Sequence, residues 1–519
     1  MPLPQNTRNI IMGDAAQQAI KEGVAIAFEL AKAAYGPRSG NVSIEAQYGD
    51  PISSHDGIFN LDHLHLEDPK TDMPIRTLVQ ASRQTNVHAG DGTTAAAIMA
   101  GAFYDEAREL LASTSISRME VAKRLQQSAA RAIEYIDSLK IPATEELLKQ
   151  VAIISASDEA LGSLISDTIQ EVGADGGVII EQFSGSGIYN EITNGFYFRK
   201  GFSQYSPLTD LTNLESRFDS VPVLVCERPL TSVGDIEPIM DRIVGLGIKQ
   251  LLIVGQVENE AMGVLVRLAY SDKVILTTVV DSPEYGALRS LFMSDIALYT
   301  GAQVLNAGAD SNDFNKDMLG EAKVVMTEYS TTLLNGDGAN NEDLEVRIRQ
   351  LQDELKVAVS PIEQDSVRNR LGRLTGKIAI VRVGGNSDTE RDEVKFRVED
   401  AVAALQAAIK DGVVPGGGVT LARVPDIPFR KAYEVPFRTL LDNAGRNTEY
   451  GLWHIREAKD WKGYDLRADQ VKLVDLRRAG VVDPTLVIKE VVANGASVAA
   501  DLIKTTVLMP FSNREAKRG

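Results

Sequence analysis

The sequence contains very little cysteine, histidine and tryptophan. Its single cysteine, Cys226, cannot form a disulfide bond within the chain, and it ends the apolar run 221–226, which is typical of a buried strand. Four of the five histidines fall in one stretch near the N-terminus, with no cysteine and no His-x3-His pair beside them. This disfavours a metal site, and we expect His63 and His65 on one face of a strand. A reducing compartment is expected.

Long apolar runs and an excess of basic residues are also absent. No run of about 18 apolar residues could span a bilayer, and residues 1–14 lack the apolar core of a secretory signal. The formal net charge is -18 and the pI is near 4.9, which argues against nucleic acid or an anionic membrane as the main partner. We therefore expect a cytoplasmic protein that binds neither nucleic acid nor membrane.

The length of 519 residues exceeds what one hydrophobic core usually supports, so two or three domains are expected. Near the N-terminus, apolar positions at three- and four-residue spacing predict four helices, and Pro142 follows the last of them. One short strand is predicted over 41–46. The predicted helices cover 15–35, 76–88, 94–113 and 117–139.

Residues 195–376 change to alternating strands and helices. They end in a predicted helical hairpin that turns near Pro361, and a strand over 378–383 and a helix over 394–411 follow. The C-terminal third is again mostly helical. This order predicts one discontinuous helical part with an α/β domain inserted into it. The apolar runs that predict buried strands of the insertion are 221–226, 250–254 and 274–280.

The run Gly90-Asp91-Gly92-Thr93-Thr94 opens an alanine-rich helix and is typical of a site for a metal-bound phosphate. Glycines let backbone N–H groups approach an anion, and a helix N-terminus favours negative charge. Asp91 can hold Mg²⁺, while Thr93 and Thr94 can donate hydrogen bonds or cap the helix. An isolated run of this kind is more often only a capped turn, so the remaining motifs decide between the two interpretations.

Other phosphate-binding and catalytic motifs are missing. Residues 372–377 have the wrong spacing for a Walker A loop, and we find neither a dinucleotide fingerprint nor a Ser-His-Asp triad. The segments 35–37 and 54–57 are glycine turns, which alone are usually structural. Asp400 points about 200° away from Val398 on the packed face of its predicted helix. Such a carboxylate is normally only a solvated charge.

Together these segments resemble the chaperonin family of the GroEL type over nearly the whole chain. The resemblance is specific because several distant motifs occur in the family's order. They are Tyr35-Gly36-Pro37 with Asn41-Val42, Asp56-Gly57, Gly90-Asp91-Gly92-Thr93-Thr94, Ile154-Ser155-Ala156-Ser157-Asp158-Glu159, Val398-Glu399-Asp400-Ala401, the segment 412–418 and Asp483-Pro484-Thr485.

The resemblance implies a multidomain chaperonin fold of α and α/β type. It implies a helical equatorial ATPase domain over 1–139 and 412–519, a small intermediate domain over 140–195 and 377–411, and an inserted α/β apical domain over 196–376. It also implies homo-oligomeric, seven-membered rings, single or stacked in pairs, that bind, enclose and release unfolded polypeptide clients, and a possible co-chaperonin. ATP, Mg²⁺ and K⁺ are the implied cofactors.

The resemblance also assigns site residues. Asp91 would bind Mg²⁺, Asp483 would hydrogen-bond the ribose, and Asp400, assisted by Asp56, would orient or deprotonate the water that attacks the γ-phosphate. Asp56 would also belong to the nucleotide site. The other nucleotide-binding residues would be Tyr35, Gly36, Pro37, Gly90, Gly92, Thr93, Thr94 and Gly417.

Some positions depart from the family pattern. His55 and Arg38 stand where lysines are usual, Pro415 is typical of the archaeal and eukaryotic group, and the segment between Gly418 and Asp483 is shortened. No apical lid insertion is evident, so the bacterial-type group is favoured. Backbone carbonyls could still provide the nucleotide and K⁺ contacts.

The predicted apical part differs most. Glu237 and Arg267 fall where the family tends to have apolar groove residues. Apolar stripes suited to a client-binding groove are still present, but such stripes are equally typical of a protein core. The alternative function is therefore a ring-forming ATP-binding scaffold with reduced or specialised foldase activity. The predicted client-binding residues are Phe202, Ile236, Met240, Met262 and Val266.

Overall fold

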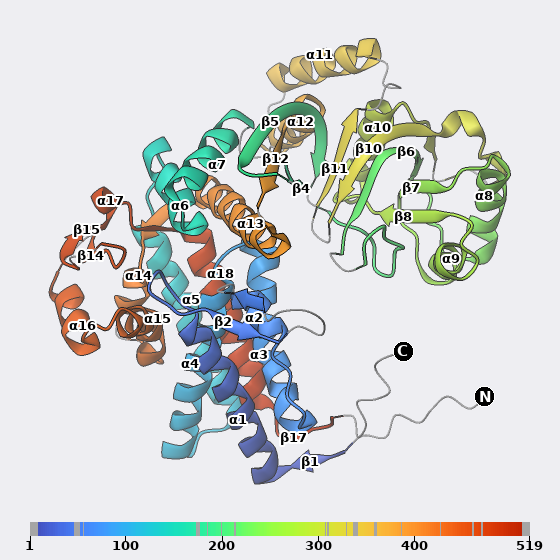
Figure 1. Cartoon of the computed structure of the whole chain (residues 1–519). Coiled ribbons are helices and arrows are strands. Elements are labelled where there is room, and N and C mark those ends of the chain that lie inside the picture. Colours follow the sequence, from blue (N-terminus) through green and yellow to red (C-terminus); the bar gives the residue numbers. More distant parts are fainter. Residues whose placement is uncertain are drawn as a thin grey trace. The chain divides into compact units, whose positions relative to one another are not determined.

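The computed structural model divides the chain into two compact units (Figure 1). Unit 1 comprises Met1–Asp167, Gln182–Gly187 and Val383–Gly519, and unit 2 comprises Thr168–Glu181 and Ile188–Arg382. The finer division into three domains stays a prediction. The residues that the structure describes are 9–45, 52–54, 57–172, 177–183, 185–198, 200–211, 214–306, 308, 311–327, 330–335, 341–357, 361–385, 387–425, 427–458, 461–468 and 471–510.

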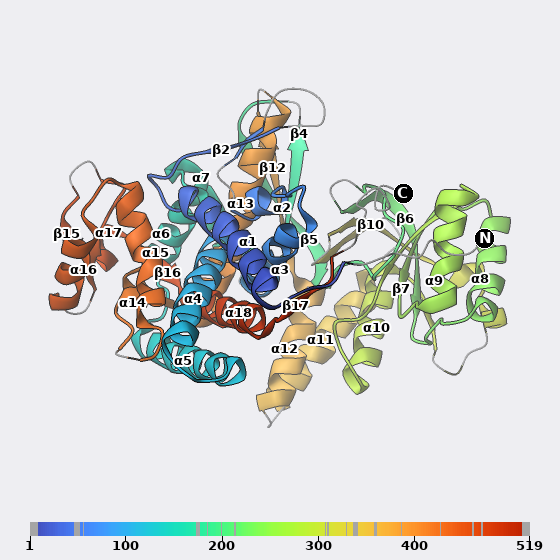
Figure 2. The same cartoon turned by 90° about the horizontal axis from the view of Figure 1, so that it is seen from below.

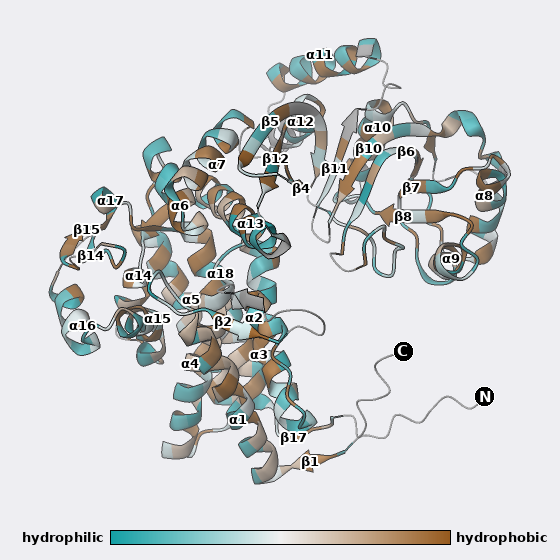
Figure 3. Cartoon of the chain, in the orientation of Figure 1, coloured by the Kyte–Doolittle hydropathy of each residue, from teal (hydrophilic) through white to brown (hydrophobic). Residues whose placement is uncertain are grey.

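Unit 1 is built on long helices that lie side by side (Figures 1 and 2). α18 (Thr485–Lys504) packs against α3 (Pro69–Ala89), α4 (Thr93–Ser113) and α5 (Arg118–Leu139), while α1 (Gly13–Ala33) packs against α3 and α4. Ten consecutive residues of α4 are buried, which explains its small side chains, because bulky ones would push the neighbouring helices apart. Figure 3 shows apolar residues concentrated along these helices.

Shorter elements complete unit 1 around this bundle. Its described residues form four two-stranded antiparallel sheets, which pair β1 with β17, β2 with β3, β13 with β16, and β14 with β15. The strands are β1 (Ile11–Met12), β2 (Val42–Ile44), β3 (Ile52–Ser54), β13 (Val413–Pro415), β14 (Lys462–Tyr464), β15 (Leu473–Asp475), β16 (Val482–Pro484) and β17 (Val507–Leu508). The remaining helices are α2 (Gly57–Asp62), α6 (Glu145–Ala156), α13 (Asp388–Asp411), α14 (Val419–Ala422), α15 (Arg430–Asn443), α16 (Thr448–Glu457) and α17 (Leu476–Ala479), and α7 (Glu159–Val172) belongs partly to each unit.

Unit 2 is built on a nine-stranded mixed sheet in the order β4-β12-β5-β11-β10-β6-β7-β8, with β9 paired to β6. The pairs β6–β7 and β7–β8 are parallel, and β10 is antiparallel to both β6 and β11. The strands are β4 (Gly177–Phe183), β5 (Ile188–Phe198), β6 (Ser216–Cys226), β7 (Gln250–Val254), β8 (Leu276–Val280), β9 (Val304–Leu305), β10 (Gly320–Met326), β11 (Thr331–Asn335) and β12 (Lys377–Gly384). The main helices are α8 (Val233–Gly245), α9 (Asn259–Val266), α10 (Ala287–Thr300), α11 (Asn341–Val357) and α12 (Pro361–Thr375).

Both faces of this sheet are buried. Successive side chains of a strand point to opposite faces, so Val223 and Val225 of β6 join one core with α10, while Leu224 and Cys226 join another with α8 and α9. Figure 2 shows α8 and α9 apart from α10 across the central strands. The prediction that Cys226 is a buried strand residue is confirmed, and burial raises the pKa of its thiol to about 11.

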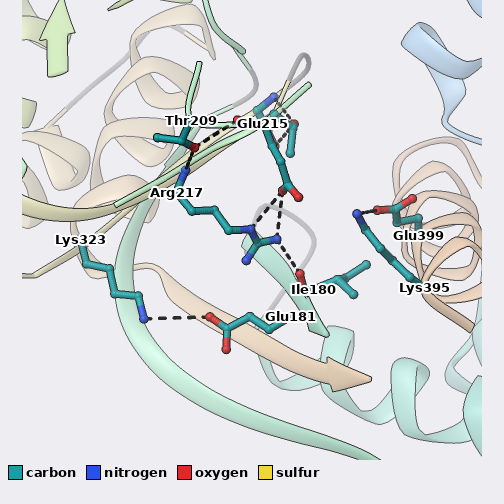
Figure 4. Close-up of polar contacts among 10 residues, drawn as sticks. Ile180, Glu181, Thr209, Glu215, Arg217, Lys323, Lys395 and Glu399 are labelled. Carbon is teal, nitrogen blue, oxygen red and sulfur yellow. Dashed lines mark hydrogen bonds and ion pairs between the residues drawn. The ribbon is translucent and has the colours of Figure 1, made fainter. Parts of the chain in front are cut away.

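Charged residues also join strands of unit 2 that are not adjacent in the sheet (Figure 4). Arg217 of β6 donates to the carbonyl of Ile180 in β4 at 2.8 Å and forms an ion pair with Glu215 at 3.0 Å. Lys323 of β10 lies 4.0 Å from Glu181 of β4. Arg217 and Lys323 therefore link β4 to strands that are not its neighbours in the sheet.

Most predicted elements are present, including the four N-terminal helices, the central strands and the helical hairpin. The starts of α3, β6 and α13 lie five to seven residues before the predicted ones. The prediction that His63 and His65 lie on one face of a strand is wrong. The preceding residues form the short helix α2, and the Nδ1 atom of His63 lies 2.8 Å from the carbonyl oxygen of Phe59, one helical turn earlier. Within the described ranges no cluster of three or more His, Cys, Asp or Glu side chains could hold a metal ion. No described helix is long and apolar enough to cross a membrane.

Four charged residues join α5, α13 and α18 within unit 1. Lys489 of α18 lies 2.5 Å from Asp411 and 3.1 Å from Asp137, and Lys140 lies 2.9 Å from Asp411 and 3.2 Å from Asp137. Burial alone would raise the pKa of Asp411, but hydrogen bonds from Lys140 and Lys489 outweigh it and hold the pKa below its usual value. This network ties the last turn of α13 to the helical bundle.

Replacing Asp411 with asparagine should lower the free energy of unfolding of unit 1 by about 1 to 2 kcal/mol at pH 7. A carboxylate whose pKa is depressed by folding stabilises the protein above its unfolded pKa of about 4, and this contribution is lost as the pH falls through the folded value. The difference between Asp411→Asn and wild type in denaturant titrations should therefore stay constant from about pH 5 to pH 8 and shrink below about pH 4.

Asp501→Asn is the matched control, because Asp501 lies on exposed α18 surface and pairs only locally with Lys504. It should change stability little at any of these pH values. Equal effects of the two substitutions would contradict a special role for the network.

Candidate nucleotide site

The run from Gly90 to Thr94 forms a tight turn between α3 and α4. Gly90 has φ 69° and ends α3, and Gly92 has φ 82° and begins α4, so both occupy the left-handed region that favours glycine. The N–H of Gly92 donates to Oδ1 of Asp91 at 2.5 Å. Neighbours leave no room for side chains: a Cβ on Gly90 would overlap the Cβ of Ala403 in α13, and one on Gly92 would lie 2.5 Å from Cγ1 of Val487 in α18.

Substitution of Gly92 by alanine should therefore destabilise unit 1 by about 1 to 3 kcal/mol, through backbone strain and overlap with α18. Thermal unfolding of the purified protein measures this loss. Gly40→Ala is the control, since a Cβ there meets nothing within 4 Å and the backbone is not in the left-handed region. A Gly92→Ala variant as stable as Gly40→Ala would contradict the tight packing of the turn.

Three segments distant in sequence bring polar side chains to Asp91. Ser155 of α6 donates from Oγ to Oδ2 of Asp91 at 3.3 Å. Burial, and then the negative charge of Asp91, raises the pKa of Asp483 in β16 to about 7. Burial, followed by Asp483 and Asp91, also raises the pKa of the Tyr35 hydroxyl. Two carboxylates, a phenol and a hydroxyl thus share one small region of unit 1.

Pairing of β13 with β16 positions Asp483. Val414 lies opposite Asp483 in the antiparallel register, and the N–H of Gly416 donates to the carbonyl of Val481 at 3.0 Å. A Cβ on Gly416 would lie 2.9 Å from Oδ1 of Asp483, so the glycine lets the backbone approach this carboxylate. Gly417 follows with φ 64° and is half-buried, and a Cβ there would lie 3.4 Å from Cγ1 of Val481, two residues before Asp483.

The turn after α1 is fixed by contacts to α15 and to a later loop. Gly36 has φ 94°, and a Cβ there would overlap Cδ2 of Leu440. Nδ2 of Asn443 donates to the carbonyl of Tyr35 at 2.8 Å, and Nε of Arg38 donates to the carbonyl of Leu466 at 3.0 Å. The guanidinium of Arg38 is thus occupied by backbone carbonyls. Pro37 lies exposed within the same turn.

Asp400 lies on α13, which packs against α3, α6 and α18. It is half-buried and one helical turn before Ala403, the residue that contacts Gly90. Residues three apart share a side of a helix, so Asp400 is on the side of α13 that meets the glycine turn. Its neighbour Glu399 instead lies 3.9 Å from Lys395 along the helix (Figure 4).

The remaining predicted nucleotide residues are Thr93, Thr94 and Asp56. Thr93 and Thr94 form the first turn of α4 and are half-buried beside Asp91. A Cβ on Gly57 would overlap Oγ1 of Thr94, so the start of α2 packs directly on this turn. Asp56 lies outside the described residues. Ser155 was not predicted as a site residue, although its serine-rich segment was one of the motifs that carried the resemblance.

The side chains around Asp91 suit a hard divalent cation. Carboxylate and hydroxyl oxygens are the donors that Mg²⁺ takes in proteins. Burial, and then the nearby negative charge of Asp91, raises the pKa of Asp483, and a cation bound beside the two carboxylates would oppose this rise. Asp91 therefore fits the predicted metal role, which stays a prediction.

The predicted client-binding side chains are largely part of the core of unit 2. Ile236, Met240 and Met262 are 0%, 2% and 4% exposed, whereas Phe202 and Val266 are half-buried. The physical reason is that α8 and α9 turn their apolar stripes toward the sheet. The apolar stripes could have belonged to a client-binding groove or to the protein core. In the structure these three residues belong to the core.

Comparisons with known proteins agree with this architecture. The chain matches the model of the TCP-1/cpn60 chaperonin family over residues 28–425. A similar fold occurs in the chaperonin gp146 from the bacteriophage EL 2 (Pseudomonas aeruginosa), crystallised in the presence of ATP-BeFx. Crystal form II matches with a TM-score of 0.75 and 18% identity, covering 96% of this chain and 98% of that one. Form I gives 0.64 and 18%, covering 97% and 99%. The protein is therefore a divergent member of the TCP-1/cpn60 chaperonin family and has the chaperonin fold.

Proposed function

We propose that this protein is an ATP-dependent molecular chaperone that assembles into rings, binds and encloses unfolded polypeptides, and releases them as ATP is hydrolysed. The observation that carries the proposal is the cluster of Asp91, Asp483, Tyr35 and Ser155 at a glycine turn that contacts α13, the helix of Asp400. Membership of the chaperonin family and the crystallisation of gp146 with ATP-BeFx support it.

In this proposal Asp91 holds Mg²⁺, and Ser155 orients the carboxylate through its hydrogen bond. The bound metal supplies charge neutralisation for the phosphates. Glycine N–H groups at the start of α4 lie where the helix N-terminus favours an anion, so Gly90, Gly92, Thr93 and Thr94 would contact phosphate oxygens. Gly36, Pro37, Gly417 and Asp483 would contact the rest of the nucleotide, and backbone carbonyls would hold K⁺.

Asp400 has a different role. Its carboxylate accepts a proton from the attacking water, or orients that water, with Asp56 assisting. General-base assistance of this kind contributes about 10²- to 10⁴-fold to rate and little to ground-state binding. Because Asp400 and Asp91 belong to different elements, hydrolysis depends on how closely α13 meets the turn.

Electron microscopy of the purified protein with and without Mg-ATP tests assembly, and phosphate release with Mg²⁺ and K⁺ tests hydrolysis. We expect seven-membered rings and Mg-dependent turnover in the cytoplasmic protein. Refolding of a denatured client, with and without ATP and a co-chaperonin, tests the chaperone activity. A monomer under all conditions would refute the proposal.

A ring-forming, ATP-binding scaffold with specialised or reduced foldase activity is the second candidate. It is favoured by the burial of Ile236, Met240 and Met262 and by the exposed charges of Glu237 and Arg267 on α8 and next to α9. Rings that hydrolyse ATP without improving recovery of a denatured client would support the scaffold over the chaperone.

A further inference from the structure

The end of β14 and the residues that follow it, 464–468, contact two turns that carry predicted nucleotide-binding residues; we call this stretch the bridging segment. At one turn, a Cβ on Gly417 would lie 3.7 Å from the carbonyl oxygen of Tyr464. At the other turn, Arg38 follows directly after Pro37, and its guanidinium donates to carbonyl groups of the segment. The bridging segment therefore connects the turn after β13 with the turn after α1.

Arg38 contacts three consecutive carbonyl groups of the bridging segment. Its Nε atom donates to the carbonyl of Leu466 at 3.0 Å, and its Nη2 atom donates to those of Ala468 at 3.2 Å and Arg467 at 3.4 Å. A guanidinium presents its donors in a rigid, planar fork, so one side chain can hold several carbonyls at once. A lysine would offer a single nitrogen on a flexible stem instead.

Other contacts fix the turn that carries Arg38. Nδ2 of Asn443 in α15 donates to the carbonyl of Tyr35 at 2.8 Å and to a carbonyl of the last turn of α1 at 2.8 Å. A Cβ on Gly36 would overlap the side chain of Leu440, so this part of the turn packs directly on α15. Loss of the Arg38 side chain should therefore leave the turn in place and act on the bridging segment.

The bridging segment keeps two further attachments without Arg38. The side chain of Leu466 is 7% exposed and belongs to an apolar core. The guanidinium of Arg467 donates to the carbonyl of Ala479 at 2.9 Å. Because these attachments remain, removal of Arg38 should loosen the segment without unfolding unit 1.

Tyr35 connects this arrangement to the acidic cluster. Burial, followed by the negative charges of Asp483 and Asp91, raises the pKa of its hydroxyl, so Tyr35 is close to both carboxylates. Tyr35 also packs against the apolar core that contains Leu466. The position of the bridging segment therefore affects how closely the protein surrounds a molecule bound beside these carboxylates.

We propose that Arg38 is a positioning residue of the nucleotide site, which holds the bridging segment closed against the turn after α1 and so raises the affinity for nucleotide without contacting the phosphates. This inference rests on the proposed function. A wall that is held in place before binding reduces the entropy lost when the ligand binds. Bound nucleotide should in return stabilise the closed segment, because coupling between two equilibria is reciprocal.

Calorimetric titration of the full-length protein with Mg-ADP tests this role. Arg38→Ala should weaken binding about 5- to 20-fold, as expected for the loss of hydrogen bonds from a charged but partly exposed donor. In steady-state hydrolysis the KM for ATP should rise by a similar factor while kcat changes less than about twofold, because Asp91 and Asp400 stay in place. Unchanged affinity in Arg38→Ala, or a loss of kcat at constant KM, would overturn the proposal.

Two further variants separate positioning from a general loss of structure. Arg38→Lys keeps the charge and part of the hydrogen bonding, so it should bind Mg-ADP only about two- to threefold more weakly than wild type. Arg423→Ala is the matched control, because Arg423 also donates to three backbone carbonyls, those of Ile455, Ala458 and Lys462, which all precede the bridging segment. It should change the affinity less than about twofold, and an effect as large as that of Arg38→Ala would contradict the role of Arg38.

Hydrogen exchange of peptides that contain 464–468 gives a readout without nucleotide. Their amides should exchange at least about fivefold faster in Arg38→Ala than in wild type, and Mg-ADP should slow them in wild type. Wild-type protein that binds no Mg-ADP would refute the proposed function together with this inference. Normal nucleotide binding with unchanged exchange in Arg38→Ala would refute the inference alone. If Arg38→Ala fails to fold, wild-type affinity and exchange in Arg38→Lys would overturn the proposal.

Discussion

Asp400→Ala should bind Mg-ATP with nearly wild-type affinity and hydrolyse it about 10²- to 10⁴-fold more slowly. The physical reason is that Asp400 belongs to α13 and not to the turn that contains Asp91, and that a general base acts on the transition state more than on the bound ground state. Single-turnover phosphate release and nucleotide titration together separate the chemical step from binding.

Glu399→Ala is the control for Asp400→Ala. Glu399 is the adjacent carboxylate on the same helix, but it is exposed and pairs with Lys395 at 3.9 Å. Its loss should change hydrolysis less than about threefold, as for a solvent-exposed ion pair. Normal turnover by Asp400→Ala, or an equal loss in both variants, would remove Asp400 from the catalytic role.

Asp91→Ala should abolish detectable binding of Mg-ATP at concentrations that saturate the wild type, because the metal must neutralise phosphate charge before any chemistry occurs. Calorimetric titration with Mg-ATP measures this loss directly, and circular dichroism checks the fold. Unchanged affinity would refute the metal role of Asp91.

Ser155→Ala provides a graded comparison for Asp91→Ala. It keeps the carboxylate and removes only the hydroxyl that donates to Oδ2. One neutral hydrogen bond contributes about 0.5 to 1.5 kcal/mol, so affinity should fall roughly 2- to 10-fold. A loss as large as that of Asp91→Ala would mean that Ser155 is itself a ligand.

The sequence predicted elements well wherever one periodic pattern was long. The helix predicted over 117–139, observed as α5, is an example, because burial of one face imposes a regular spacing on its apolar residues. It failed at His63 and His65, because the helix α2 that precedes them has six residues and is too short to leave a periodic signal. The apolar stripe of α8 was identified correctly, but periodicity shows only that a face is packed and not against what.

The candidate site was predictable in part for a different reason. Asp91 and its glycines form a local motif, whereas Ser155 and Asp483 meet it only through the packing of α6 and the pairing of β13 with β16. Residues that meet only through long-range packing show no fixed spacing along the sequence that could reveal them as one site. The resemblance supplied Asp483, and nothing local singled out Ser155.

The contact between Gly90 and Ala403 has a further consequence. Two of the smallest side chains meet there, next to Asp91 on one element and one turn from Asp400 on the other. This contact lets the two elements approach closely. It therefore sets the distance between the carboxylate proposed to bind the metal and the one proposed to activate water. Any added methylene at either position would push the two elements apart without altering either carboxylate. In the proposed mechanism, hydrolysis therefore depends on the small size of two residues that supply neither carboxylate.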